Sequence, residues 1–373
     1  MYLNLGEVNF QPDFIGNMFT FGSVATGLAA LPAGLMYERI GPKKALLVGL
    51  TANFVNVIQI FAMQPSVLLS ASLISGLVGT LGWVAAAPFM MENSKSEERT
   101  YLFSVNWALM TIMGVVGSYV GGFLPDFFNR LLNLATGTDG AATGYRMTLL
   151  ISVALALATA IPIVLIKEKR LPESQKMADL LSLRNIRSRG TILRFMLPAA
   201  LIGFGAGFIV PLSTLFFKLK LFATTEQIGA ISAVSNVTLG IGTLAAPILS
   251  RRLGKVRSIV ICQYLSMPFI MMITLSPNLA LSSTAFISRA ALMNMAGPIS
   301  STLQMELVTE SERGTTNGLM VMSDSIPRAL TASISGRMMA GSDFYTPFVF
   351  TTFTYFLASS LYFIFFRKAE RHT

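Results

Sequence analysis

Three charged side chains lie inside long apolar stretches of the 373-residue sequence, and their types suit anion binding and proton transfer. Arg289 lies in one such stretch, and Asp324 and Arg328 lie in the next. Asp324 and Arg328 are four residues apart, so on a helix they share one face. An arginine there could hold an anionic group of a ligand, and Asp324 could take up and release a proton.

A structural role competes with this interpretation for each of the three residues. Asp324 and Arg328 could form a permanent ion pair that never titrates. Arg289 could extend its guanidinium toward the outer surface and take no part in binding.

Further polar and aromatic residues complete the set of candidate substrate and coupling residues. Asn294 follows Arg289 in a stretch that Pro298 predicts to be kinked. Asn106 and Trp107 lie in an earlier stretch, where both could line a cavity. For these two residues, packing between helices is the favoured interpretation.

The residues of common catalytic and metal sites are missing from the sequence. The single histidine, His372, is next to last, and the single cysteine is Cys262. These counts exclude a histidine relay, a cysteine metal cluster and an intrachain disulfide. There is no G-x-x-x-x-G-K-[ST] phosphate loop and no H-E-x-x-H motif. We expect no enzyme, no cofactor and no metal.

The composition indicates a chain that crosses a membrane many times. Apolar residues make up 53% and charged residues 12%, whereas soluble chains average about 45–50% and about 25%. About eleven stretches are long enough to span a bilayer as helices, and none alternates as a β-barrel strand does. The fold class is therefore an all-α polytopic membrane protein. The predicted spans are 14–36, 44–63, 66–90, 102–124, 147–166, 194–217, 228–249, 257–275, 280–304, 315–337 and 345–366.

Lysine and arginine are divided unevenly between the loops on the two sides. One set of loops carries 21 of the 28 basic residues, and this bias marks the cytoplasmic side. Its longest member, 167–193, separates an N-terminal bundle (1–166) from a C-terminal bundle (194–373) with a short tail. The net charge of +10 therefore reflects the topology of the chain, and the basic loops are expected to face anionic lipid headgroups. Nucleic acid is not expected as a partner.

Two short segments occur once in each half of the sequence. Glu38–Lys44 resembles Arg251–Arg257 at an offset of 213 residues, and Glu97–Thr100 resembles Ser311–Gly314 at an offset of 214. Two matches at nearly one offset predict a duplication, and many secondary transporters contain parallel repeats of six spans. The first loop follows one span whereas its counterpart follows two, so we expect one span to be missing from the first half.

The first loop resembles the loop between the second and third helices of the major facilitator superfamily. The family pattern is G-x-x-x-D/E-R-x-G-x-K/R-K/R, and the sequence from Gly34 to Lys44 reads GLMYERIGPKK. The resemblance implies helices two to twelve of a twelve-helix fold, arranged as two pseudo-symmetric bundles that rock around a central site. It also implies a cytoplasmic gate, for which a basic turn obeying the positive-inside rule is the alternative. The gate residues are Gly34, Glu38, Arg39, Gly41, Lys43, Lys44, Arg251, Arg252 and Gly254.

A second family pattern, G-P-x-x-G-G, is matched in part and is typical of antiporters. The sequence from Gly117 to Gly122 reads GSYVGG, so the glycines agree and the proline does not. The preceding span lacks the arginine that many proton-coupled exporters have there. Glycines of this kind allow helices to approach closely, and the residues expected to do so are Gly114, Gly117, Gly121 and Gly122.

The sequence thus predicts a secondary active transporter that moves a small molecule by alternating access. We expect it in the inner or plasma membrane, as a monomer in the lipid bilayer, with an ion gradient, protons being the candidate, as its energy source. The 21 methionines and the glycine pattern favour efflux. The alternatives are an importer of a nutrient, either a sugar or an organic anion, and a truncated membrane protein that does not transport.

Overall fold

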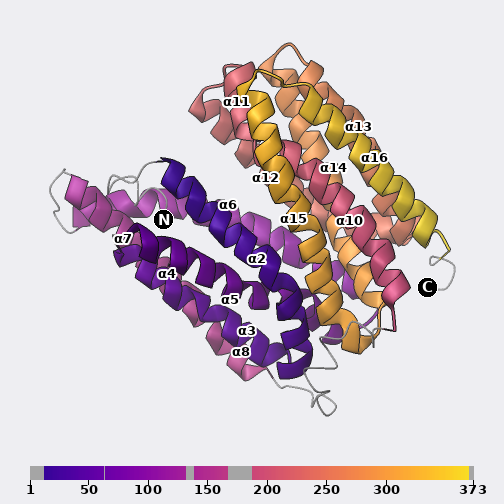
Figure 1. Cartoon of the computed structure of the whole chain (residues 1–373), viewed down its shortest axis with the longest axis horizontal. Coiled ribbons are helices and arrows are strands. Elements are labelled where there is room, and N and C mark those ends of the chain that lie inside the picture. The colour runs from indigo at the N-terminus through magenta and orange to yellow at the C-terminus, as the bar shows by residue number, and fades with distance from the viewer. Residues whose placement is uncertain (1–11, 63, 132–137, 167–186, 369–373) are drawn as a thin grey trace. The chain divides into compact units, whose positions relative to one another are not determined.

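The computed structural model describes residues 12–62, 64–131, 138–166 and 187–368, and Figure 1 shows their helices. Within these ranges the chain contains helices, turns and bends but no β-strand, which confirms the all-α fold class. The helices are α2 (Pro12–Ile40), α3 (Pro42–Leu50), α4 (Ala52–Phe61), α5 (Pro65–Glu92), α6 (Arg99–Leu131), α7 (Thr138–Ala158), α8 (Ala160–Leu165), α10 (Arg189–Ile209), α11 (Ser213–Lys220), α12 (Thr225–Leu253), α13 (Lys255–Leu275), α14 (Leu279–Glu306), the short 3₁₀ helix η2 (Glu310–Glu312), α15 (Arg313–Ala340) and α16 (Thr346–Phe366).

Each predicted span corresponds to one helical stretch of the structure. Among the described residues, eight stretches are both long and apolar enough to cross a membrane. Helices α14 and α15 are not among the eight, although each has 28 residues. They are the helices that carry Arg289, Asp324 and Arg328, whose charges lower the hydropathy of the spans in which they lie.

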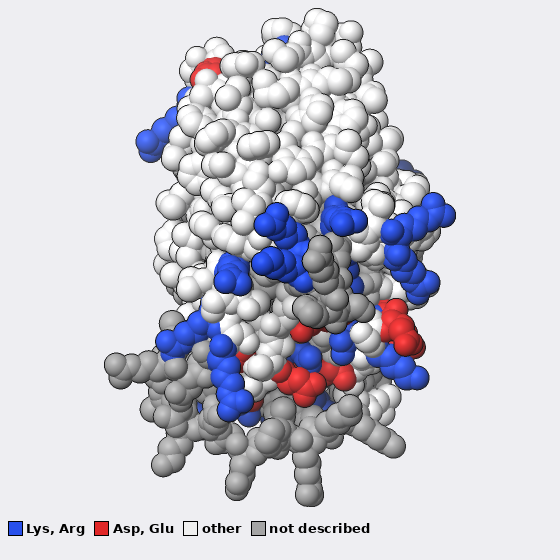
Figure 2. Space-filling view, turned by 90° about the vertical axis from the view of Figure 1, so that its right-hand side faces the viewer, with Lys and Arg blue, Asp and Glu red and all other residues white. Residues whose placement is uncertain are grey.

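The surface of the molecule agrees with a lipid environment. Figure 2 shows a broad area without charged side chains and a separate region where Lys, Arg, Asp and Glu gather. Leu155, Ile241 and Leu330 expose 67%, 65% and 64% of their surface. Side chains of this kind are stable in contact with hydrocarbon, so the exposed apolar surface is what membrane-spanning helices require.

The chain forms two compact units, which are described separately. The first comprises the described residues of Met1–Pro88 and Val116–Asn185, and the second those of Phe89–Val115 and Ile186–Thr373. The segment Phe89–Val115 therefore packs with the second unit, although the sequence boundary predicted at 167–193 groups it with the first bundle. This segment contains the end of α5 and the first half of α6.

Close contacts between glycines organise the helices of the first unit. A Cβ added to Gly49 of α3 would lie 2.5 Å from the backbone nitrogen of Gly82 in α5, and one added to Gly76 would lie 2.5 Å from the carbonyl oxygen of Gly22. Real Cβ atoms do not approach backbone atoms this closely. The backbones of α2, α3 and α5 are therefore in contact at positions where only glycine fits.

The predicted duplication is visible in the backbone of two glycines. Gly41 has φ 82° and ψ 166°, and Gly254 has φ 83° and ψ 163°. Each is the N-cap residue immediately before a helix, α3 in the first unit and α13 in the second. This region of conformational space is essentially restricted to glycine, so the two loops related by the offset of 213 residues share one unusual turn.

In the second unit, α15 and α16 pack against α10. Helices α13 and α14 pack together, and α12 packs on α14. Phe208 and Phe216 lie in an apolar core with Ile270, Phe348 and Tyr355. Tyr355 connects this core to Arg289, to which it is hydrogen-bonded.

Candidate substrate and coupling site

Three glycines of α10 allow two other helices to approach its backbone. A Cβ added to Gly203 would overlap the backbone of Asp324, and one added to Gly207 would overlap the backbone of Arg328. On the neighbouring side, a Cβ at Gly205 would lie 2.9 Å from the ring of Tyr355. The alternating glycines of the segment GFGAGF thus bring Asp324, Arg328 and Tyr355 to one level of the bundle.

Hydroxyl groups hold these helices together at the same level. The Oγ1 of Thr331 donates a hydrogen bond to the carbonyl oxygen of Phe204 at 2.8 Å, and the Oγ of Ser335 donates to that of Phe208 at 2.6 Å. From α16, the Oγ1 of Thr351 donates to the carbonyl oxygen of Gly205 at 2.8 Å. Such bonds between helices contribute about 0.6 kcal/mol each on average in membranes, so together they fix the position of α15 and α16.

Asp324 and Arg328 form an ion pair along one face of α15. The Nη2 of Arg328 lies 2.6 Å from Oδ1 and 2.8 Å from Oδ2 of Asp324, and its Nε lies 3.0 Å from Oδ2. The side chain of Arg328 is 34% exposed and that of Asp324 is 33% exposed. The pair is therefore well formed but accessible, in the middle of a helix whose neighbours are apolar.

Arg289 is directed inward and contacts Tyr355. Its Nη2 donates a hydrogen bond to the Tyr355 hydroxyl at 3.0 Å, and its guanidinium carbon lies 5.9 Å from the centre of the tyrosine ring. Arg289 is only 5% exposed, and its Nε has no hydrogen-bond partner among the described residues. An arginine reaching toward the outer surface would not be buried in this way, so the geometry favours the inward orientation.

Tyr355 is the residue of this cluster that the sequence did not reveal. It is 1% exposed, it accepts the hydrogen bond from Arg289, and it lies close enough to Arg328 for an electrostatic interaction. The stretch that contains Tyr355 is rich in Phe, Tyr and Thr, and nothing in it distinguishes this tyrosine. The only available signal was in α10, where alternating glycines predict a close approach of other helices.

The remaining candidate residues contact their own helix or pack against a neighbouring one. The Nδ2 of Asn294 donates to the carbonyl oxygen of Ala290 at 2.8 Å, within α14. The Nδ2 of Asn106 lies 3.8 Å from the sulfur of Met110, within α6. A Cβ added to Gly297 would lie 3.8 Å from the Trp107 ring. These contacts agree with helix packing for Asn106 and Trp107, and a substrate contact by either residue stays a prediction.

Three of the antiporter-like glycines have open space beside their Cα atoms. A Cβ added to Gly114, Gly117 or Gly121 would meet no described atom within 4 Å, and the surroundings of Gly122 lie outside the described side chains. The close approaches of helices occur instead at the glycines of α3, α5 and α10 named above.

The gate motif of the first unit includes a helix cap. Lys43 donates hydrogen bonds through Nζ to the carbonyl oxygens of Val164 at 2.6 Å and Ile166 at 3.3 Å, at the C-terminal end of α8. A cation at this position satisfies carbonyl groups that have no partner within the helix and interacts favourably with its dipole. Arg39 and Lys44 are exposed, and Gly34 and Gly41 are buried.

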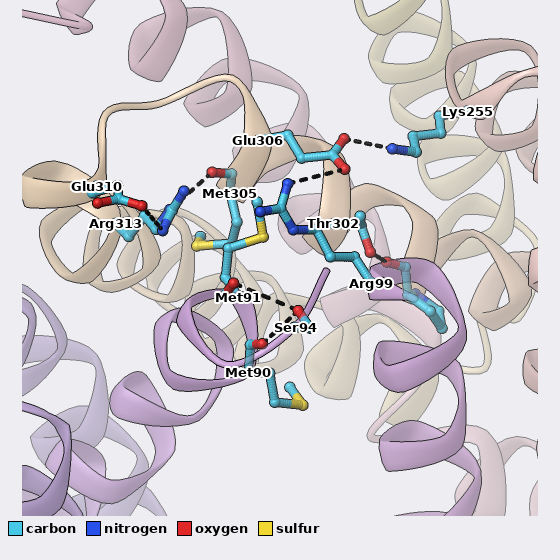
Figure 3. A network of polar contacts seen from close by, with 11 residues as sticks. Met90, Met91, Ser94, Arg99, Lys255, Thr302, Met305, Glu306, Glu310 and Arg313 are labelled. Atoms are coloured by element: carbon cyan, nitrogen blue, oxygen red, sulfur yellow. Dashed lines mark hydrogen bonds and ion pairs between the residues drawn. The ribbon is translucent and has the colours of Figure 1, made fainter. Parts of the chain in front are cut away.

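A second polar network lies at the corresponding end of the second unit, and Figure 3 shows it. The Glu306 carboxylate lies 2.5 Å from Nζ of Lys255 and 3.8 Å from Nη1 of Arg99. Arg313 donates through Nε to the carbonyl oxygen of Met305 at 3.2 Å and contacts Glu310 at 3.4 Å. Glu306 is thus shared by residues at the beginnings of α6 and α13, which the sequence assigns to different halves.

Close to this network in the sequence, Glu312 caps the start of α10. Its carboxylate accepts hydrogen bonds from the backbone nitrogens of Arg187 at 2.5 Å and Ser188 at 3.2 Å. Burial raises the pKa of Glu312, but hydrogen bonds from Ser188, Thr309 and the two backbone N–H groups outweigh burial and lower the pKa below its ordinary value. The ionised carboxylate therefore stabilises this helix terminus.

Arg251 and Lys255 also line a cavity of about 330 Å³. Arg251 and its neighbour Arg252 are both exposed on the last turn of α12. The cavity lies between the beginning of α6 and the junction of α12 with α13. Its other lining residues are Ser96, Glu97, Thr100, Tyr101, Pro247 and Ser250.

A sequence profile described as "Major Facilitator Superfamily" matches residues 2–332 of this chain. No curated protein matches it. The match covers both units and includes the gate loop, the antiporter-like glycines and the three intramembrane charges.

Several solved structures of transporters are similar in fold. A bacterial homologue of the iron transporter ferroportin, in an outward-facing state, has a TM-score of 0.68 and 16% identity, over 96% of this chain and 91% of that one. The E. coli fucose:proton symporter FucP has a TM-score of 0.72 and 16% identity, over 96% and 92%. The human organic anion transporter MFSD10 (TETRAN) has a TM-score of 0.67 and 15% identity, over 97% and 88%. At these identities the likeness concerns the fold alone.

Proposed function

Because this chain belongs to the Major Facilitator Superfamily, we propose that it is a secondary active transporter that moves a small molecule by alternating access. In this proposal, α14, α15 and α16 supply the substrate and coupling site, and protons are the coupling ion. Membership of a transporter family also supports the expectation that the chain is not an enzyme. The proposed setting is the inner or plasma membrane, with the protein as a monomer.

The observation that carries the proposal is the accessible ion pair of Asp324 and Arg328. Charged residues are costly at the bilayer centre, about 2.5–3.5 kcal/mol each on insertion scales, and they mark substrate pathways and proton relays. The pair lies within one helix and about one third of each side chain is exposed. A partner that binds Arg328, or a proton that binds Asp324, can therefore exchange with the existing contact without unpacking the bundle.

Two directions of transport have separate support. The glycine pattern near Gly117 favours efflux, since it resembles the antiporter motif. The arginines Arg289 and Arg328 favour uptake of a nutrient, either an organic anion or a sugar, because guanidinium groups bind carboxylates and hydroxyl oxygens.

The experiment is a proton-flux assay on purified protein in liposomes that contain a pH-sensitive dye. Sugars, organic anions and lipophilic cations are added outside in turn, with protein-free liposomes as the control. Proton entry that follows addition of one class indicates symport and uptake, whereas proton exit indicates antiport and efflux.

Two outcomes of this assay would contradict the proposal. If compounds cross only by downhill exchange that is insensitive to the proton gradient, proton coupling is wrong. If no compound class crosses faster than in protein-free liposomes, while circular dichroism shows folded protein, the transport assignment itself fails.

A further inference from the structure

Arg289 is a buried cation without a carboxylate partner. None of the described carboxylates forms an ion pair with it, and its side chain donates a hydrogen bond to Tyr355. Arg313, the other buried arginine of this unit, contacts both Glu310 and a backbone carbonyl. Buried charges are normally paired, so the isolation of Arg289 requires an explanation.

The charges of the cluster do not balance. Arg289, Arg328 and an ionised Asp324 together carry one net positive charge, and the other member, Tyr355, is neutral. Helix α10 contributes only small and apolar residues at this level, among them Gly203, Gly205 and Gly207. One bound negative charge would neutralise the cluster, and in the low dielectric of the bilayer this gain is larger than in water.

The donors of the cluster are positioned for an oxygen ligand. The Nε of Arg289 is buried with no partner. The Tyr355 hydroxyl accepts a hydrogen bond from Arg289, so its own proton is available to donate to another group. Two hydrogen-bond donors from α14 and α16, one of them charged, are the arrangement that binds a carboxylate or another oxyanion.

We propose that Arg289 and Tyr355 recognise a single anionic group on the transported molecule. The inference rests on the proposed transport function and adds the substrate class, a small monoanion such as a carboxylate. A cation would be repelled by the net positive charge. A neutral sugar would leave that charge unbalanced, so both are disfavoured by the same cluster.

Binding of benzoate, compared with neutral benzamide of nearly the same shape, tests the substrate class. Both are titrated against purified full-length protein by isothermal calorimetry and by thermal shift. We expect benzoate to bind and to raise the melting temperature, and benzamide to bind at least about tenfold more weakly, because charge-assisted hydrogen bonds are lost. Acetate and methylphosphonate extend the comparison to smaller anions and to a second oxyanion.

Variants assign the binding to this site. Arg289→Gln should weaken benzoate binding by about tenfold or more, and Arg289→Lys should recover part of the loss because it restores the charge but not the planar donor set. Tyr355→Phe should weaken binding by a smaller factor, since it removes one donor and keeps the ring. Arg337→Gln, on the last turn of α15, is the matched control and should bind benzoate as the unmodified protein does.

Two results would overturn the inference. One is that none of the three anions binds more tightly than benzamide. The other is that benzoate binding is the same in Arg289→Gln, Tyr355→Phe and the unmodified protein. If Arg289→Gln does not fold, Tyr355→Phe and Arg289→Lys decide the question. Anion binding without any transport would contradict the proposed function and leave only anion recognition by Arg289 and Tyr355. Proton-coupled transport of a neutral compound without anion binding would support the proposed function and overturn the inference.

Discussion

Asp324 contributes little to holding the helices together, because its ion pair stays within α15. The two residues are one turn apart on the same helix, and about one third of each side chain is accessible. Such a pair does not connect α15 to α10 or α16. A charge that is costly in a membrane and adds little packing is better explained by a role in coupling.

The variant Asp324→Asn tests this role. It should abolish accumulation driven by a proton gradient, because the amide cannot take up and release a proton, and exchange down a substrate gradient should persist. The measurement is uptake into liposomes with and without an imposed pH difference. Asp343→Asn, which alters a carboxylate that caps α16 from a loop, is the control. Full pH dependence in Asp324→Asn would show that coupling occurs elsewhere.

The three charged residues of the cluster are recognisable in the sequence, whereas Tyr355 is not. Arg289, Asp324 and Arg328 were identified because a charge in an apolar stretch is conspicuous. Tyr355 was missed because it is one of several aromatic residues in α16, and only its contact with Arg289 distinguishes it.

At the scale of elements, the glycines of α10 determine how closely α15 and α16 approach. Gly207→Ala should lower stability by about 1–3 kcal/mol, because its Cβ would overlap the backbone of Arg328 and force α15 away. Substrate affinity should fall as well, since Arg328 moves. Thermal unfolding and substrate binding measure the two effects. Gly336→Ala, at a position in α15 with open space, should change neither, and equal behaviour of the two variants would contradict the packing argument.

The gate loop depends on the conformation of Gly41. Leucine at this position would adopt a conformation that costs about 1–3 kcal/mol, and it would displace Lys43 from the end of α8. Gly41→Leu, and also Arg39→Ala, should slow transport while circular dichroism shows a folded protein. The measurement is the initial rate in liposomes, with Gly229→Ala as the control. Normal rates in both variants would refute the gate interpretation.

The cap that Glu312 places on α10 predicts a pH dependence. Because the pKa of Glu312 is lowered in the folded state, its stabilising effect is present above the ordinary pKa of glutamate and is lost as the pH falls through the lowered value. The melting temperature of Glu312→Gln should therefore be below that of the unmodified protein at neutral pH, and the difference should shrink in acid. Glu310→Gln, with a side chain that is 86% exposed, should show a smaller difference; an equal one would contradict the prediction.

At the scale of the whole molecule, the duplication and the polar network are related. Met91 and Glu92 precede Arg99 with the same spacing as Met305 and Glu306 precede Arg313. The two equivalent arginines have different partners. Arg99 contacts Glu306, which also contacts Lys255, whereas Arg313 contacts Glu310 and the carbonyl of Met305. Within the second unit, the network therefore joins residues from both halves of the duplicated sequence.

The proposed alternating access requires contacts of this kind to form and break. Glu306→Gln removes the charge shared by Lys255 and Arg99, so the end of the bundle that holds the network should open more often. A thiol probe on Thr100→Cys, which is 8% exposed, should react several times faster in the Glu306→Gln variant. Cys262→Ser, which removes the only native cysteine, is the background and the control. An unchanged rate of labelling would show that the network does not restrict opening.

The sequence by itself determined the all-α class, the eleven helical stretches, the duplication and the membership of a transporter family. These properties depend on hydropathy, loop charge and local motifs, which can be read along the chain without knowledge of contacts. Only the tertiary structure decided that Arg289 turns inward to Tyr355, 66 residues away, and that Phe89–Val115 packs with the second unit. The physical reason is that such contacts depend on how closely helices approach one another, as where Gly205 lets Tyr355 lie against α10, and hydropathy and loop charge do not specify that distance.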